Sequence, residues 1–293
     1  MNFFRNFLAS FLGSITALIF IISLVFILIA GIASVASFDK NILSGEISSN
    51  SILNLDLDKD VYDNIPVTQE FEEILGVSPE IIKFLDLINV IELATENKDI
   101  KGINLKTQSP KMGWSQALTI RKSLQRFKEE GKFIYTYGDF FSQKGYYLAS
   151  VSDSIFLNPM GNIELRGLGA EVLYYKELQE KYGFKMEVIR HGKYKSAVEP
   201  YLDDKMSEAN RIQIRSLLNS IWGGIANQIK LSRKVSTENF NKVVDNLDAT
   251  LPVNAFRNNI VDGIVSKTQY KQKVKRKLGI KPDEKLNNVS YLQ

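Results

Sequence analysis

Residues 100–157 read IKGINLKTQSPKMGWSQALTIRKSLQRFKEEGKFIYTYGDFFSQKGYYLASVSDSIFL. Apolar runs rich in Ile, Phe and Tyr, which are typical of strands, alternate here with stretches whose apolar residues recur at helical spacing. Strands are expected at 100–105, 132–137 and 154–157, and helices at 115–130 and 143–151. Strands and helices alternating at this spacing predict βα units and a largely parallel sheet covered on its faces.

The same reading extends outward on both sides of this stretch. On the amino side we expect a strand at 52–57, a loop at 58–69 and a helix opened by Ser78 and Pro79 that runs through Ile91. On the carboxyl side the pattern becomes mostly helical from Ser207 to Lys234, with Ser207 as the helix N-cap. The remaining expected elements are a strand at 163–165, a helix at 169–182, a strand at 185–190, helices after Ser236 and Val253, and a basic helix end at 271–277.

Composition excludes several classes of site. The 293 residues include no cysteine and one histidine, His191, so the usual His/Cys zinc cage and the Cys-ligated iron–sulfur cluster cannot form. We therefore expect no metal and no cofactor. Lys plus Arg number 37 against 33 Asp plus Glu, a balance too even for a nucleic-acid-binding protein.

The amino-terminal stretch predicts a membrane span. No charged residue occurs between Arg5 and Asp39, and about 20 apolar residues suffice for a helix to cross the hydrocarbon. We expect residues 8–35 to cross the bilayer as an uncleaved anchor, because the apolar stretch exceeds a signal-peptide core; a cleaved signal ending at Ala36 is the alternative. Arg5 leaves the amino terminus cytoplasmic and sends the remainder across the membrane.

Residues 192–200, GKYKSAVEP, are the most unusual segment for chemistry. A lysine accepts a proton at neutral pH only if burial and nearby positive charge lower its pKa. Lys195 meets that condition if its apolar neighbours bury it and Lys193 supplies the like charge; a solvated loop lysine is the alternative. Ser196 is not an obvious nucleophile for Lys195, because adjacent side chains on a strand point to opposite faces.

A longer stretch, residues 192–211, GKYKSAVEPYLDDKMSEANR, resembles the signature of bacterial signal peptide peptidase A in its long, tandem-repeat form. Residues 138–150 and 167–176 match as well, as does Asn158-Pro159. The resemblance implies a ClpP/crotonase-like α/β spiral and a Ser/Lys dyad peptidase. It also implies that the lysine base comes from the first repeat and the serine from the second, with Lys195 at the position of that lysine.

The chain departs from the family pattern at the serine. Where the second repeat carries a serine before two glycines, this sequence has Gln143-Lys144-Gly145, and Gln143 cannot be a nucleophile. Ser142 is the in-chain substitute to consider, although its position before Gln143 also fits a helix N-cap. Residues 109–113, SPKMG, lie where glycine N–H groups would stabilise an oxyanion, and Lys111 and Met112 disfavour that role.

The resemblance therefore implies a base-bearing half of a serine endopeptidase that degrades cleaved signal peptides. The expected domains are an anchor at 1–38 and a peptidase repeat at 39–293 with a helical oligomerisation arm from about residue 207. Expected partners are signal peptides or other extended hydrophobic peptides, a serine-bearing second repeat, the lipid bilayer and further copies of the chain, with no nucleic acid. The resemblance places the protein in the bacterial inner membrane, crossing once, with its soluble domain in the periplasm.

Four alternatives stay open at the level of sequence. A membrane-anchored peptide-binding or scaffold domain without chemistry explains the missing serine. His191 is the base that a Ser-His-Asp triad would need. Gly167-Leu168-Gly169 begins a dinucleotide fingerprint but lacks its third glycine. A crotonase-type acyl-CoA enzyme shares the fold class.

The aromatic pairs at 140–141, 146–147 and 174–175 suit core and subunit packing, and some of them could line a hydrophobic peptide groove.

Overall fold

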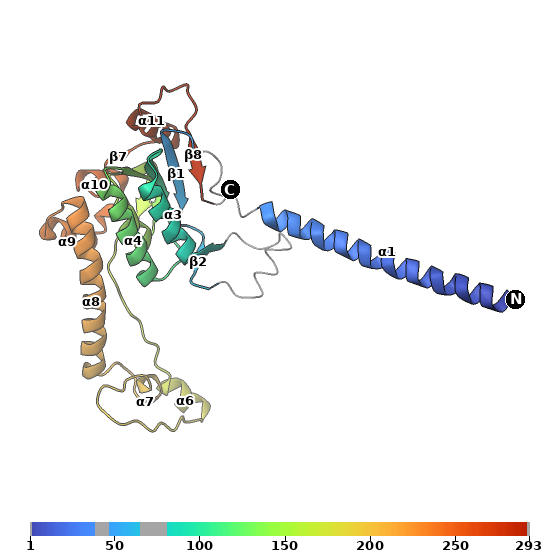
Figure 1. The fold of residues 1–293 in the computed structure, drawn as a ribbon. Coiled ribbons are helices and arrows are strands. Elements are labelled where there is room, and N and C mark those ends of the chain that lie inside the picture. Colours follow the sequence, from blue (N-terminus) through green and yellow to red (C-terminus); the bar gives the residue numbers. More distant parts are fainter. Residues whose placement is uncertain (1, 39–46, 65–80, 292–293) are drawn as a thin grey trace.

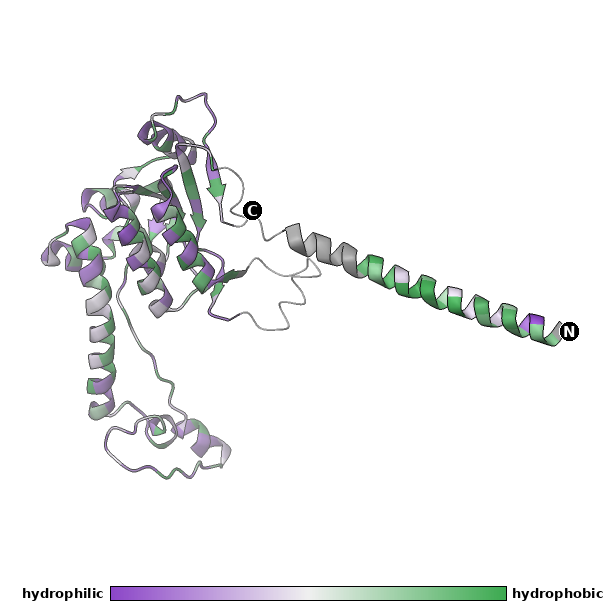
Figure 2. Ribbon diagram, in the orientation of Figure 1, coloured by the Kyte–Doolittle hydropathy of each residue, from purple (hydrophilic) through white to green (hydrophobic). Residues whose placement is uncertain are grey.

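The structure is a computed structural model that describes residues 2–38, 47–64 and 81–291. The first element is one long helix, α1 (Asn2–Phe38). Phe3–Leu28 within it has a mean hydropathy of 2.7, and none of it is buried against the rest of the chain. Its length and composition suit a membrane anchor or a signal sequence, and Figure 2 shows hydrophobic residues along most of this helix.

A six-stranded parallel sheet organises the rest of the fold. Its strands lie in the order β7-β6-β5-β4-β1-β8, and every pair in it is parallel. The strands are β1 (Ser51–Asp56), β4 (Ile100–Lys106), β5 (Phe133–Phe141), β6 (Ser154–Ile163), β7 (Gly263–Ile264) and β8 (Asn288–Ser290). A second, two-stranded parallel sheet pairs β2 (Asp60–Tyr62) with β3 (Ile81–Lys83).

Helices cover the main sheet on both faces. Leu53 and Leu55 of β1 join the larger core, whereas Ile52 joins a second cluster with Phe156 and Tyr270, because successive strand residues face opposite sides. The larger core is built with α3 (Phe84–Glu96), α4 (Trp114–Glu129), α5 (Gln143–Ala149), α9 (Thr237–Asp245), the 3₁₀ turn η2 (Asp248–Thr250) and α10 (Pro252–Arg257). The second cluster lies under α11 (Lys267–Lys277). The predicted α/β class with a parallel sheet is confirmed.

One segment leaves this layered structure and returns to it. After β6 the chain runs outward to α6 (Lys176–Tyr182) and α7 (Glu199–Leu202) and comes back along α8 (Glu208–Arg233). Figure 1 shows α6 and α7 at the far end of α8, away from the sheet. We call residues 166–220 the arm, and the described residues 47–64, 81–165 and 221–291 the body.

A buried arginine joins the returning helix to the body. Arg121 of α4 is fully buried, and its guanidinium donates to Ser150 Oγ (2.8 Å) and to Ser232 Oγ on α8 (2.6 Å). It also donates to the carbonyl oxygens of Tyr147 and Gln228. Burial lowers the pKa of Arg121 to about 10. Because a buried cation without hydrogen bonds is costly, these acceptors fix the base of α8 against α4 and α5.

Most predicted elements of the body are confirmed, with shifts at their ends. Three details of the body prediction are wrong: Ile81 and Ile82 lie in β3 and α3 starts at Phe84, the loop after β1 contains β2, and 154–165 contains one strand instead of two. Ser78 and Pro79 lie outside the described residues. The apolar pattern of 81–91 fits a helix face, but residues 81–83 pair with β2 and therefore form a strand.

Two predictions on the arm are also wrong. Residues 169–175 are not helical, since α6 begins only at Lys176, and residues 185–190 form no strand. Neither segment pairs with a strand, and most of their side chains are exposed, so little packing stabilises the helix or the strand that their composition predicts. In contrast, Ser207 caps α8 as predicted, its side chain accepting from the backbone N–H of Asn210.

Candidate active site

Lys195 lies in the arm, in the loop that precedes α7. Its side chain is exposed, and the predicted buried strand before it is instead an exposed, extended segment. The backbone N–H of Lys195 donates to the Gly192 carbonyl (3.3 Å), and Gly192 has a φ of +99°, a conformation that favours glycine. The loop is therefore shaped locally, and its lysine points outward rather than into the body.

A buried carboxylate holds this loop on the start of α8. Glu199, four residues after Lys195, is only 1% exposed. Its carboxylate accepts from Ser207 Oγ (2.5 Å) and Asn210 Nδ2 (2.9 Å), and the Arg190 guanidinium lies 3.8 Å away. Burial by itself raises the pKa of Glu199, but the hydrogen bonds from Ser207 and Asn210, together with Arg190, hold that pKa below its ordinary value.

A hollow with both apolar and polar lining opens next to the lysine loop. It measures about 590 Å³ and is lined by Tyr194 and, from α8, by Ile212, Gln213, Ser216, Leu217 and Ser220. Tyr194, Ile212 and Leu217 are all more than half exposed. Exposed apolar side chains gathered beside a polar loop mark a surface that suits an apolar partner or ligand.

The position of the expected serine lies in the body, at the start of α5. Ser142 is the N-cap of α5 and accepts from the Gly145 N–H (3.1 Å), as the capping interpretation predicts. Gln143, which follows it, turns its side-chain amide onto the first residues of the arm. Gln143 Oε1 accepts from the N–H groups of Arg166 (3.0 Å) and Gly167 (2.9 Å), and its Nε2 donates to the Gly167 carbonyl.

The structure does not bring Ser142 and Lys195 together. Ser142 lies on the body, whereas the Lys195 loop sits at the outer end of α8 (Figure 1). About 17 residues of α8 separate that end from Ile225, where the helix packs into the core, which is roughly 25 Å of helix. A general base acts at about 3 Å from the proton it takes, so Lys195 does not serve as the base for Ser142 of the same chain.

Two backbone N–H groups of the loop at 109–113 are bonded within the chain. The Ser109 N–H donates to Asp58 Oδ1 (2.7 Å), and the Gly113 N–H donates to Gln116 Oε1 (2.7 Å). Met112 is buried in the core. These two N–H groups are therefore not free to stabilise an oxyanion.

The other candidate residues are not arranged for chemistry. His191 is exposed in the same loop as Lys195. Gly167, with a φ of +86°, is followed by extended chain up to Lys176, so no helix N-terminus is available to a phosphate there. Within the described residues, no three His, Cys, Asp or Glu side chains gather to hold a metal ion.

The segment from α4 to the loop after α11, which contains both the Ser142 turn and the lysine loop, matches a family model. That model is peptidase family S49, and it matches residues 126–281. The chain belongs to peptidase family S49. The predicted resemblance to signal peptide peptidase A is thereby confirmed at the level of the family, and the predicted class of serine peptidase agrees with it.

Two curated relatives extend the family S49 match. The chain is 31% identical over 218 residues to Protease 4 of Haemophilus influenzae, an alignment that covers 72% of this chain and 35% of the relative. It is 29% identical over 201 residues to a chloroplastic serine protease SPPA of Arabidopsis thaliana, covering 66% of this chain and 28% of the relative. The chain thus spans about a third of the length of these relatives.

Solved structures were compared as well. A membrane-bound stomatin-specific protease, 1510-N, solved as a mutant, aligns with a TM-score of 0.42 at 10% identity. The alignment covers 83% of this chain and 94% of that one.

Two polar residues that matter for the site were not singled out from the sequence. Gln143 was considered only as a missing nucleophile, and Glu199 only as part of the 192–200 motif. Eight residues separate Glu199 from Ser207, which exceeds the reach of local side-chain bonding patterns, so the sequence carried no local signal for their contact. The Gln143 contacts join segments 23 and 24 residues apart, so no local pattern reveals them.

Proposed function

We propose that this chain supplies the general base of a membrane-anchored serine endopeptidase whose serine lies outside residues 1–293. Neutral Lys195 takes the proton of that serine hydroxyl, and the serine oxygen attacks a peptide carbonyl. The protonated amine then gives its proton to the leaving amine of the substrate. Water, deprotonated by the same lysine, releases the acyl-enzyme and restores the serine.

The position of Lys195 is the observation that carries the proposal. Its side chain is exposed at the end of an arm that projects from the body, while Gln143 occupies the place of the serine in this repeat. A lysine acts as a general base only when it is buried, and docking of a serine-bearing repeat over the loop would supply that burial. The same docking places the missing hydroxyl within reach of the amine.

The hollow next to Tyr194 supports an apolar peptide substrate. Ile212 and Leu217 line it together with Tyr194, and it opens beside the loop that carries Lys195. An extended peptide pairs through its backbone regardless of sequence, while such pockets accept alternate side chains. Cleaved signal peptides have the apolar side chains that this surface accepts, so they are the proposed substrate class.

The proposed location is the bacterial inner membrane, with α1 as a single uncleaved span and the remainder in the periplasm. Arg5 lies near the start of α1, ahead of the expected span at residues 8–35, which favours a cytoplasmic amino terminus. Projecting apolar side chains on the arm outside the hollow, such as Tyr182 and Phe184, also suit contact between further copies of the chain. Oligomerisation through the arm is part of the proposal.

The test is the variant Lys195→Ala in the complete assembly, with peptidase turnover measured on an apolar peptide. Loss of the base lowers kcat by about 10³-fold or more. The matched control is Lys185→Ala, since Lys185 is another exposed arm lysine outside the proposed site. Near-normal turnover in Lys195→Ala would rule Lys195 out as the base.

A second function is favoured by one observation, the hydrogen bonds of Gln143. Gln143 stands where the family has its serine, and its side-chain amide binds the backbone of the same chain. This arrangement suits a membrane-anchored domain that holds peptides without cleaving them. In that case wild type and Lys195→Ala bind a labelled apolar peptide equally, and neither cleaves it in the complete assembly.

A further inference from the structure

The helix α11 concentrates positive charge. Its sequence, KTQYKQKVKRK, contains six basic residues and no acidic one, whereas the whole chain has a net charge of +4. Among the described residues, none of these six side chains forms a salt bridge, unlike Lys106, Lys176 and Lys242 elsewhere. The remainder of the chain is therefore slightly acidic, and α11 forms a separate cationic surface.

Part of this surface is concave and has an aromatic floor. A groove of about 490 Å³ is lined by Lys273, Arg276 and Lys277 of α11 and by Tyr135, Phe156 and Ser154 of the sheet. The Lys273 ammonium lies 5.3 Å from the Phe156 ring and the Lys277 ammonium 5.7 Å from the Phe133 ring, which orders both cations.

The carboxylate at the rim of the groove is already engaged. Asp262 also lines the groove, but it accepts from Arg233 Nη2 (2.8 Å) and from the Ile155 N–H (2.8 Å). Three cations and the Ser154 hydroxyl therefore remain available to a ligand. This combination suits a phosphate-bearing ligand, because guanidinium and ammonium groups bind phosphate oxygens. The aromatic rings can contact the apolar part of the same ligand.

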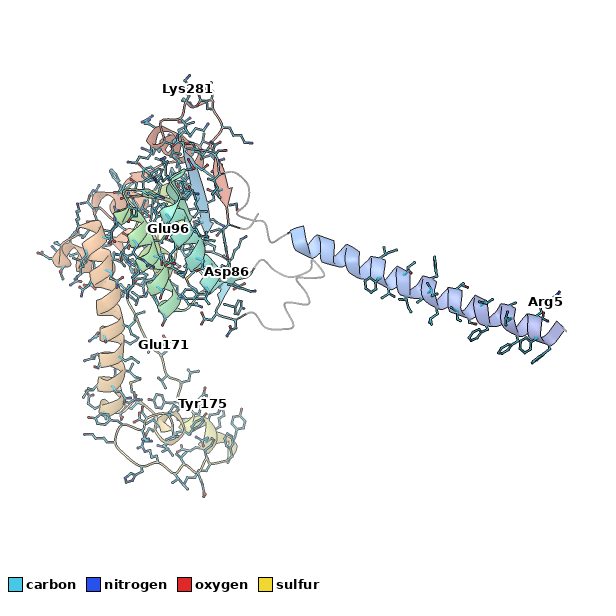
Figure 3. All side chains as sticks on the ribbon, viewed as in Figure 1. Arg5, Asp86, Glu96, Glu171, Tyr175 and Lys281 are labelled. Carbon is cyan, nitrogen blue, oxygen red and sulfur yellow. The ribbon has the colours of Figure 1, made fainter. Side chains whose placement is uncertain are left out.

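The chain itself keeps this groove near the proposed membrane span. Asn50 Nδ2 donates to the carbonyl of Leu278, the residue that ends α11 (2.9 Å), and Asn287 Nδ2 donates to the Ser49 carbonyl. About a dozen residues lie between the end of α1 at Phe38 and Asn50, and they span at most roughly 40 Å when extended. The arm lies at the other end of the molecule, as Lys281 and Tyr175 show in Figure 3.

We propose that the α11 groove, formed around Lys273, Arg276 and Lys277, binds the phosphodiester headgroups of anionic lipids in the membrane that α1 spans. The inference rests on the proposed anchoring. Each basic residue near an anionic leaflet strengthens binding about fivefold, and a short tether raises the effective concentration of the lipid surface to millimolar levels. Binding at α11 orients the body so that the arm points away from the bilayer.

The test uses the full chain in nanodiscs of phosphatidylcholine alone or with about a third phosphatidylglycerol. The sequence has no cysteine, so a single cysteine at Gln272, exposed on α11, or at Glu238, exposed on α9, carries an environment-sensitive fluorophore at one known place. A lipid-borne quencher is expected to reduce the Gln272 signal at least threefold in the anionic discs. In neutral discs the Gln272 signal should stay unchanged. The Glu238 signal should stay unchanged in neutral and in anionic discs.

The charge requirement is tested by the combined substitutions Lys273→Gln, Arg276→Gln and Lys277→Gln. They should abolish quenching at Gln272, whereas Lys98→Gln, Lys122→Gln and Lys181→Gln, which remove three exposed cations elsewhere, should preserve it. Salt at 0.5 M should also reverse it. Quenching that is equal in neutral discs would overturn the proposal, and so would release by millimolar inorganic phosphate, which would indicate a soluble phosphate ligand instead.

Insertion of α1 is checked with the same labelled chain reconstituted in vesicles of the same two lipid compositions, by its resistance to alkaline carbonate extraction. A chain that resists extraction but shows no quenching disproves the headgroup site alone. A chain that is extracted disproves the anchoring on which the site depends.

Discussion

The body and the arm of this chain are built from similar residues but are held in different ways. In the body, Leu53, Ile103 and Phe141 are almost fully buried, and helices cover both faces of the sheet. On the arm, Tyr182, Phe184 and Ile189 are exposed. Apolar side chains of the kind that form the core in the body therefore lie at the surface in the arm. Figure 3 shows Glu171 and Tyr175 on this segment, away from the sheet.

This difference indicates where the two halves of the proposed dyad come from. The body holds the Ser142 turn rigidly but has no nucleophile at Gln143, whereas the arm carries Lys195 on a loop fixed mainly by one buried carboxylate. An arm with exposed apolar side chains is expected to complete its packing on another repeat. Substitutions that act on one region and leave the other unchanged test this contrast.

The largest effect is expected from Gly145→Ala in the body. A Cβ at Gly145 would lie 2.4 Å from the backbone carbonyl oxygens of both Thr107 and Gln108, and backbone does not move aside easily. We expect the free energy of unfolding to fall by about 3 kcal/mol, measured by urea denaturation in detergent.

The matched substitution on the arm is Gly169→Ala. No atom lies within 4 Å of a Cβ built at Gly169, so stability should change by no more than about 0.5 kcal/mol. Equal losses in the two variants would mean that the arm packs against structure as tightly as the body does.

The next effect is expected from Glu199→Gln, which removes the charge at the base of the lysine loop. Hydrogen bonds to a charged acceptor contribute about 2 kcal/mol, and Ser207 and Asn210 both donate here. Hydrogen exchange across 196–211 should accelerate about 30-fold, while exchange in β4 and β5 stays unchanged. The exposed Glu187→Gln serves as the control and should alter neither region.

The same carboxylate makes the arm sensitive to acid. Its pKa is held below the ordinary value, so its contribution to stability is present above the unfolded pKa and is lost as pH falls through the folded pKa. Proteolytic protection of the arm should therefore be constant from about pH 7 to 5 and fall below about pH 4. In Glu199→Gln this acid-induced loss should disappear; an unchanged profile would assign it to other groups.

The smallest effect is expected from Gln143→Ala, where the arm leaves the body. The variant loses hydrogen bonds to the backbone of Arg166 and Gly167, so we expect a loss of about 1 kcal/mol, confined to exchange at 164–168. The control is Gln125→Ala on the exposed side of α4, which should be neutral. A global loss of stability in Gln143→Ala would show that this contact supports the body as well as the arm.

Sequence patterns predicted the body well because its interactions are periodic and local. The strand at 100–105, the helix at 115–130 and its stop at Gly131, with a φ of +76°, are all present with small shifts. The caps at Ser142 and Ser207 were readable because a helix N-cap bonds within three residues. The family resemblance could also be predicted from the sequence, because residues 192–211, which carry it, are contiguous.

The domain boundary at 38–39, the role of Lys195 and its partners stay predictions. By itself, the sequence determined the α/β class, the apolar amino-terminal helix and the position of the candidate base, because periodicity and motif spacing are properties of neighbouring residues. Only the tertiary structure decided that residues 169–175 and 185–190 extend as an arm, that Gln143 binds the base of that arm and that Glu199 is buried beneath the lysine loop. Each of these depends on which distant segments find a packing partner, and a local pattern does not contain that information.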